Sequence, residues 1–180
     1  MLRLVLLLCL LGGVARAEII GEPIDRAATE DEMKASLRSI VLVDAAGEKL
    51  PLVSLLGSGK RVFVTIWAYW CPNCLAEMAG YRKIAAACPQ KTRMIFVSAR
   101  NADFPKDVAK FDSYGLPWKI RYAEKSIPVE TARAFFGVTP EGQVMTPLHY
   151  FVTPKGEVEA IVNARMDFES PKKLEAFCRD

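Results

Sequence analysis

Apolar and polar positions occur in blocks along this chain, and the blocks predict its elements. The run Arg61–Trp67 is β-branched and aromatic, which is typical of a buried strand. The stretch Leu75–Cys88 is rich in alanine and other good helix formers, and Pro89 should end that helix. Arg93–Ser98 is again apolar and predicts a second buried strand. The centre of the chain therefore predicts a strand, a helix and another strand.

Shorter blocks on both sides predict two hairpins. Ile40–Val43 and Glu48–Leu52 are two strand-like runs separated by a short turn, which predicts a hairpin before the central elements. Leu148–Val152 and Glu157–Val162 predict a second hairpin after them. The intervening Thr153-Pro-Lys-Gly156 has proline and glycine where a tight turn favours them.

Helical patterns and one further alternating run complete the expected layout. The alternating run Trp118–Tyr122 predicts a short strand. Helices are expected over Glu30–Arg38, Asp103–Tyr114, Val129–Phe136 and Ser170–Arg179. This order predicts an α/β fold with a central mixed sheet flanked by helices and an N-terminal β-hairpin extension.

The N-terminal end has the features of a secretory signal peptide. Arg3 supplies a short basic region, Leu4–Val14 is an apolar core, and Ala15-Arg16-Ala17 is a small-x-small cleavage site. An uncleaved membrane anchor is the alternative, but the apolar core is well short of the roughly 20 residues that span a bilayer. We therefore predict a signal peptide over 1–17, a polar leader over 18–39, one domain over 40–180, and a periplasmic or otherwise exported protein.

Composition and net charge give little information about binding partners, beyond the absence of a signal for nucleic acid. Arg3 and Arg16 leave with the signal peptide, which lowers the formal net charge from +3 to +1. Nothing in that balance indicates a nucleic acid as partner. The remaining chain of about 160 residues suits one domain, expected as a monomer. Cysteines of an exported protein are usually paired or functional, and the mature chain keeps Cys71, Cys74, Cys88 and Cys178.

The motif Cys71-Pro-Asn-Cys74 is the most informative feature of the chain. It stands between a predicted strand and a predicted helix, and such a cysteine pair can close and reopen a disulfide. The start of the helix favours a thiolate at Cys71, which is also expected to be the more exposed member. Cys71 should therefore attack a partner disulfide, and Cys74 should resolve the mixed disulfide.

Two other interpretations of this cysteine pair are open. One is half of a zinc site, which needs two further ligands, but Cys88, Cys178 and His149 lack paired spacing. No metal and no cofactor is therefore expected. The other is a static disulfide, although the strain of so short a loop favours redox activity. His149, the only histidine, is expected to face solvent or a hydrogen-bond partner on its hairpin.

The stretch Trp67-Ala-Tyr-Trp-Cys-Pro-Asn-Cys-Leu-Ala-Glu-Met78 resembles the active site of exported thioredoxin-like proteins of the TlpA, ResA and DsbE type. The resemblance covers about Ile40–Asp180 and implies a thioredoxin-like fold. It implies an exported thiol-disulfide oxidoreductase that reduces cysteine-containing exported proteins, such as cytochrome c maturation factors. Its electrons would come from a membrane thiol donor.

Two alternative functions are compatible with the same motif. One is an oxidant that donates disulfides, because Pro72 occurs in both kinds of protein. The other is a non-catalytic module that binds an apoprotein, or copper through the cysteines with Met78 or Met145 as a soft third ligand.

The resemblance also implies a partner-binding surface. Thr146-Pro147 stands where this fold has a cis proline opposite the cysteines, and the backbone there pairs with an incoming partner strand. Tyr69 and Trp70 flank Cys71 and are expected to form an apolar lip for docking, whereas Trp67 is expected in the core.

Glu77 matches an acidic position of the same group. A carboxylate three residues after Cys74 can exchange protons with it and disfavour its thiolate by like-charge repulsion. Cytoplasmic thioredoxins carry an acid at the strand position of Thr65, so Glu77 is expected to be the substitute. The alternative is an ordinary solvated helix residue.

Cys88 and Cys178 are predicted to form a structural disulfide. In a thioredoxin-like layout the helices that end at these two cysteines cover the same sheet face and run in the same direction. Their ends should then be neighbours, and a bridge needs Cα atoms within about 7 Å. The alternative is two separate buried thiols.

Overall fold

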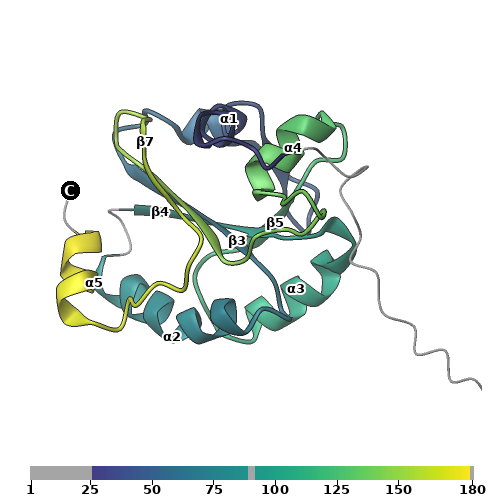
Figure 1. The fold of residues 1–180 in the computed structure, drawn as a ribbon. Helices are drawn as coiled ribbons and strands as arrows, with labels where there is room; N and C mark the ends of the chain where they lie inside the picture. The colour runs from purple at the N-terminus through teal and green to yellow at the C-terminus, as the bar shows by residue number, and fades with distance from the viewer. Residues whose placement is uncertain (1–25, 89–91, 179–180) are drawn as a thin grey trace, which may run out of the picture.

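The computed structural model describes residues 26–88 and 92–178 (Figure 1). The signal peptide predicted over 1–17 and the first part of the leader lie outside these residues. Within the described part, none of the helices combines the length and the apolar composition needed to cross a bilayer.

A mixed sheet forms the centre of the molecule, with seven strands among the described residues in the order β2-β1-β5-β4-β3-β6-β7. Strands β3, β4 and β5 are parallel, whereas the outer pairs are antiparallel. The strands are β1 (Val41–Val43), β2 (Lys49–Pro51), β3 (Arg61–Trp67), β4 (Thr92–Ser98), β5 (Ile120–Ala123), β6 (Leu148–Val152) and β7 (Val158–Val162).

Helices cover both faces of this sheet. In Figure 1, α2, α3 and α5 lie below it and α1 and α4 above it. The helices are α1 (Glu30–Ser36), α2 (Pro72–Ala87), α3 (Phe104–Asp112), α4 (Val129–Phe136) and α5 (Pro171–Cys178), with 3-10 turns η1 (Leu52–Leu55) and η2 (Asn101–Asp103). The predicted α/β fold, a mixed sheet flanked by helices with an N-terminal hairpin, is confirmed.

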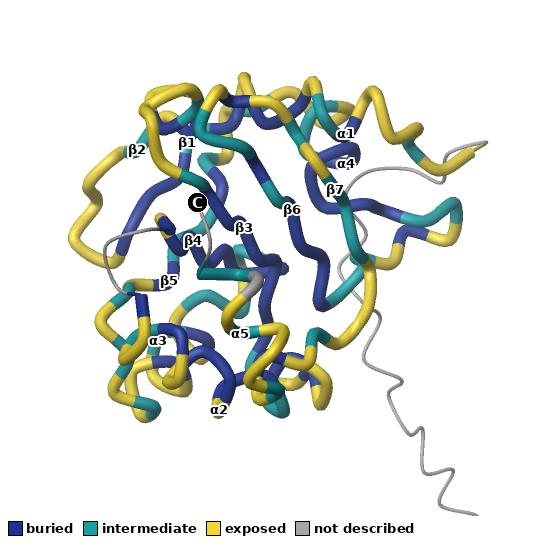
Figure 2. Tube along the Cα trace, turned by 90° about the vertical axis from the view of Figure 1, so that its left-hand side faces the viewer, coloured by how far each residue is buried: buried dark blue, intermediate teal, exposed yellow. Residues whose placement is uncertain are grey.

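Strand β3 is apolar at every position except Arg61 and Thr65, because it lies between β4 and β6 and helices cover both faces of the sheet. Val62, Val64 and Ile66 are all buried. In Figure 2 the central strands are mostly dark blue, the colour of buried residues. A strand covered on both faces has no solvent side, so its sequence does not alternate. This strand leads directly to the cysteine motif.

The packed part of the chain includes a helix before residue 40, within the predicted polar leader. Helix α1 starts with a capping box between Thr29 and Glu32 and packs against α4. Its residue Met33 and the following Leu37 are buried in the core. The polar residues around them mask these two apolar anchors in the sequence pattern.

Two other predicted elements differ at their ends. Strand β5 begins at Ile120, two residues later than expected. Helix α3 spans Phe104–Asp112 and is shorter than the predicted Asp103–Tyr114. Its end is fixed by Gly115, whose φ of 65° lies in the left-handed region that glycine adopts without strain.

Candidate active site

The two motif cysteines lie at the N-terminus of α2 and are joined by a disulfide, with Cα atoms 5.2 Å apart. Cys71 is the N-cap residue, and its sulfur accepts a hydrogen bond from the Cys74 N–H at 3.2 Å. Pro72 occupies the first turn, where its missing N–H costs nothing. The free N–H groups of this turn can stabilise a thiolate on Cys71.

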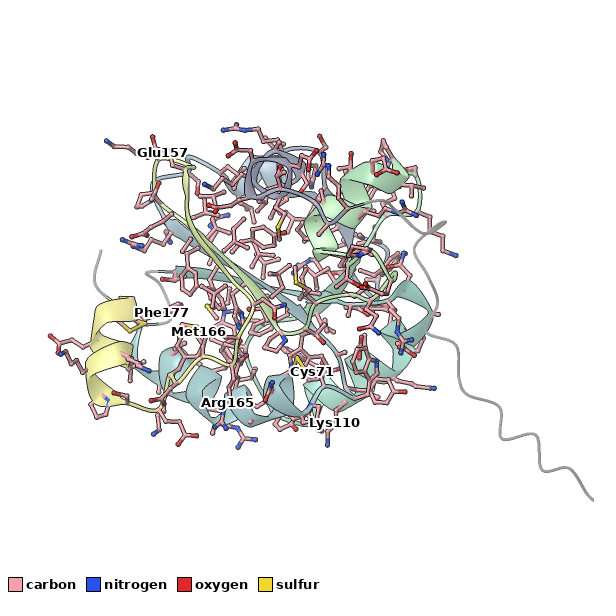
Figure 3. The ribbon with its side chains drawn as sticks, in the orientation of Figure 1. Cys71, Lys110, Glu157, Arg165, Met166 and Phe177 are labelled. Carbon is pink, nitrogen blue, oxygen red and sulfur yellow. A yellow bond between two sulfur atoms is a disulfide. The ribbon has the colours of Figure 1, made fainter. Side chains whose placement is uncertain are left out.

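Both cysteines are largely covered, and only Cys71 keeps contact with solvent. Its exposed fraction is 3%, against 0% for Cys74. A partner sulfur therefore reaches Cys71 first. Figure 3 labels Cys71 at the end of the α2 ribbon.

The Thr146–Pro147 peptide bond is cis, as predicted. It immediately precedes β6, whose first residue Leu148 pairs with Ile66 near the end of β3. Because β3 and β6 are antiparallel, β6 starts at the edge of the sheet where β3 ends. The cis bond and the segment that leads to Cys71 therefore lie at the same edge.

The two aromatic residues before Cys71 differ in exposure. Trp70 is 39% exposed, and its indole N–H donates to Asp103 at 3.1 Å. The Arg100 guanidinium lies 4.9 Å from the Trp70 ring centroid, and the Lys106 ammonium lies 5.6 Å from that of the partly buried Tyr69. These contacts hold both rings beside the cysteine pair, where they can form the expected lip.

Glu77 is buried, so the interpretation as a solvated helix residue is wrong. Only 2% of the residue is exposed. Its Oε2 accepts from the Tyr81 hydroxyl at 2.8 Å, and its Oε1 accepts from the Met166 N–H at 2.5 Å. Burial and the nearby Glu77 carboxylate raise the pKa of Tyr81 well above its usual value, so the phenol stays a donor.

His149 is also buried, so the expectation that it faces solvent is wrong, and its side-chain partners come from β3 and α2. Its Nε2 lies 3.1 Å from Glu77 Oε1, and its Nδ1 lies 3.0 Å from the Thr65 hydroxyl. The Phe63 ring stacks on the imidazole at 5.3 Å. Thr65 and His149 are direct partners in the β3–β6 ladder, so their side chains share the sheet face that α2 covers. The pairing of β6 with β3 is therefore the signal that could have placed His149 beside Thr65.

Asp107 is a buried residue near the site that the sequence patterns did not indicate. Its carboxyl oxygens accept from the Tyr69 N–H at 2.7 Å and from the Ser98 hydroxyl at 2.5 Å. Burial raises the pKa of Asp107 to about 6, against the opposing effect of these two donors. Asp107 lies one turn before the buried Phe111 on α3, which is the signal that could have placed it inside. It fixes the backbone two residues before Cys71.

Asp107→Asn is expected to flatten the pH dependence of stability. The pKa of Asp107 rises from a usual 3.8 to about 6 on folding, so the protonated carboxyl stabilises the fold below about pH 4 and that contribution is lost as the pH rises through about 6. Between those values, the wild-type free energy of unfolding should change by about 1–3 kcal/mol relative to the variant. Urea unfolding from pH 4 to 7 measures this change.

The exposed Asp112 on the same helix supplies the matched control for that measurement. Asp112→Asn should follow the wild-type curve, because its carboxyl has no buried contact to lose. Parallel curves for wild type and Asp107→Asn would show that Asp107 titrates alike in the folded and unfolded chains.

The second cysteine pair lies at the other end of α2. Cys88 and Cys178 are joined by a disulfide, with Cα atoms 5.7 Å apart. Cys178 is the last residue of α5, which lies on the same sheet face as α2 (Figure 1). The aromatic ring of Phe177 packs against Phe63 at 5.4 Å and fixes α5 against the sheet.

No group of three or more histidine, cysteine, aspartate or glutamate side chains that could hold a metal ion comes together among residues 26–88 and 92–178. The single histidine contacts Glu77 and Thr65. The described site is therefore two cysteines at a helix N-terminus, a cis proline, and a buried polar cluster behind them.

Comparisons with known proteins agree with this geometry. The AhpC/TSA family model matches residues 32–161. The thiol-disulfide oxidoreductase ResA of Oceanobacillus iheyensis is 26% identical over 123 residues, which is 68% of this chain and 57% of ResA. The ResA of Halalkalibacterium halodurans is 31% identical over 122 residues, 67% of this chain and 62% of that protein. The matches thus span less than two thirds of the length of either relative.

Among solved structures, the chain is similar to a secreted disulfide oxidoreductase of Mycobacterium tuberculosis that is homologous to Escherichia coli DsbE. The TM-score is 0.59 at 23% identity, and the match covers 79% of this chain and 95% of that one. At this identity the likeness shows a shared thioredoxin-like fold.

Proposed function

Because this chain belongs to the AhpC/TSA family, we propose that it is an exported thiol-disulfide oxidoreductase with Cys71 and Cys74 as its redox pair. The observation that carries the proposal is the disulfide at the N-terminus of α2, at the sheet edge where the cis Thr146–Pro147 bond lies. The relatives named as oxidoreductases support the same chemistry.

The pair acts as a reductant of partner disulfides. The Cys71 thiolate attacks one sulfur of the partner disulfide, and the other sulfur leaves as a thiolate and takes up a proton. Cys74 then loses its proton and attacks Cys71. The mixed disulfide breaks, the partner leaves as a dithiol, and the Cys71–Cys74 disulfide forms. The partner gains two electrons and two protons, and a membrane thiol donor restores the reduced pair.

The surroundings of the pair serve partner binding and proton transfer. The backbone at Thr146–Pro147 pairs with an extended partner segment, and the Tyr69 and Trp70 rings contact its side chains. Glu77 accepts the proton that Cys74 loses. Partners are exported proteins with an accessible disulfide, and cytochrome c maturation factors fit that class.

The reduction potential of the Cys71–Cys74 pair tests the direction of this reaction. We expect a value near that of thioredoxin, about −270 mV, rather than about −120 mV as in a disulfide donor. The mature protein, without residues 1–17, is equilibrated with glutathione or dithiothreitol buffers and its free thiols are counted. Cys88→Ala/Cys178→Ala is the matched control, because it leaves only the redox pair to titrate. A reduction potential near about −120 mV would instead mean that the protein donates disulfides as an oxidant.

A further inference from the structure

Four polar side chains form a buried cluster behind the cysteine pair. Thr65 comes from β3, Glu77 and Tyr81 from α2, and His149 from β6, and each is at most 2% exposed. A carboxylate and an imidazole in an apolar core lose hydration that only good hydrogen bonds offset. The proposed reaction uses Glu77 as a proton acceptor, and His149 has no part in it so far.

The contacts of His149 assign a hydrogen to its Nε2 atom. This nitrogen lies 3.1 Å from Glu77 Oε1 and 3.2 Å from the backbone carbonyl oxygen of Ala164. The carbonyl oxygen can only accept, and the carboxylate is acceptor-only when ionised. The imidazole therefore donates from Nε2 toward Glu77, whatever the state of Nδ1.

Thr65 allows the His149 ring to donate from Nε2 to Glu77 in both the neutral and the charged state of the imidazole. Its hydroxyl lies 3.0 Å from His149 Nδ1 and can donate to the neutral ring or accept from the charged one. The donation from Nε2 to Glu77 thus persists when the imidazole gains or loses a proton.

The segment that follows β7 closes the cluster from the side of α2. Met166 donates its N–H to Glu77 Oε1, and Figure 3 shows Met166 beside the α2 ribbon. Phe168 packs so closely on Gly80 that an added Cβ there would lie 2.6 Å from the Phe168 Cβ. Gly80 therefore lets this segment approach α2 and cover Glu77.

These contacts leave one acceptor position open on the carboxylate. An ionised carboxylate has about four lone-pair positions. Among residues 26–88 and 92–178, His149 and Met166 donate to Oε1, while only Tyr81 donates to Oε2. The remaining position is on Oε2. Among the described residues, the titratable groups in hydrogen-bond contact with Glu77 are Tyr81 and His149. The cysteine pair lies at the start of the same helix, with Cys74 three residues before Glu77, and Arg165 is exposed.

We propose that His149 is a positioning residue for the reaction, which holds Glu77 by a hydrogen bond from Nε2 so that the open position on Oε2 serves the proton of Cys74. The inference rests on the proposed function. During turnover the Cys74 proton passes to Glu77 and then to the partner thiolate that departs when the mixed disulfide breaks. His149 keeps its Nε2 hydrogen throughout, so it orients the acceptor without being consumed.

Two amide variants of His149 separate this role from simple packing. His149→Gln places an amide N–H near the position of Nε2 and can still donate to Glu77. His149→Asn keeps a polar group near Nδ1 and Thr65, but its side chain is too short to reach Glu77. The probe is oxidised glutathione, reacted with the reduced mature protein from pH 5 to 9.

His149→Gln should exchange within about threefold of wild type with the same pH profile. His149→Asn should be about tenfold slower, with an altered pH profile, and Glu77→Gln should show the same change of profile. The double variant Glu77→Gln/His149→Asn should be no slower than Glu77→Gln alone, because both changes remove one function. Equal behaviour of the Asn and Gln variants, or additive losses in the double variant, overturns the inference.

A measurement on the unaltered protein does not depend on variant folding. The chain has one histidine, so a tag-free sample gives one imidazole ¹⁵N pattern, and Nε2 should stay protonated from pH 5 to 8. A tautomer with hydrogen on Nδ1 alone overturns the inference. Wild-type protein without any exchange at any pH would instead refute the proposed function, which keeps the two failures distinct.

Discussion

Cys71→Ser is expected to abolish thiol-disulfide exchange, whereas Cys74→Ser is expected to retain the first step and stop there. Of the two cysteines, only Cys71 contacts solvent, and it also caps α2. The buried Cys74 therefore cannot start the attack on a partner disulfide. Loss of the nucleophile should lower the rate by about a thousandfold or more. Without Cys74, the mixed disulfide between Cys71 and the partner has no resolving thiol and should accumulate.

Non-reducing electrophoresis and mass spectrometry of the trapped adduct measure both outcomes. A peptide disulfide serves as the partner in vitro, and an extract of exported proteins serves to identify natural partners. The double variant Cys71→Ser/Cys74→Ser is the control and should trap nothing. Adducts that form on Cys71→Ser instead would reverse the two roles.

Removal of the Cys88–Cys178 disulfide should produce the largest loss of stability. This bond closes a loop with a sequence separation of 90 residues. In the chain-entropy model, opening a loop of that length costs about 4 kcal/mol of unfolding free energy. Without the bond, α5 is held to α2 and the sheet mainly by contacts such as those of Phe177 and Phe168 with Phe63.

Urea unfolding of Cys88→Ala/Cys178→Ala under non-reducing conditions tests this expectation. Cys71→Ser/Cys74→Ser is the matched control, because its lost bond has a sequence separation of only 3 and constrains the unfolded chain much less. An equal loss in both double variants would mean that loop closure is not the source of the stability.

Several features of the fold follow from local sequence because their causes are local. Helix α4 spans Val129–Phe136 as predicted, since Gly137 takes the left-handed conformation that ends it, with φ of 57°. The largely apolar run of β3 and the start of α2 at Cys71 and Pro72 depend on neighbouring residues in the same way. Such signals act over one turn of helix or a few residues of strand.

The location of polar residues could not be predicted by the same means. Glu77 and His149 are 72 positions apart in sequence, and Glu77 and Met166 are 89 apart. Glu77 and His149 are polar residues whose ordinary place is the surface, and both are buried because distant segments supply their hydrogen-bond partners. Asp107 is buried for the same reason, by contacts with Ser98 and the Tyr69 N–H.

The sequence by itself determined the cysteine pair, its helix and the order of the elements. Hydrophobic periodicity and turn chemistry encode these features within short segments. Only the tertiary structure decided that Met33 and Leu37 join the core and that His149 faces Glu77. Burial of a polar group is stable only where its hydrogen-bond partners converge, and that convergence is a property of the sheet register and of helix packing.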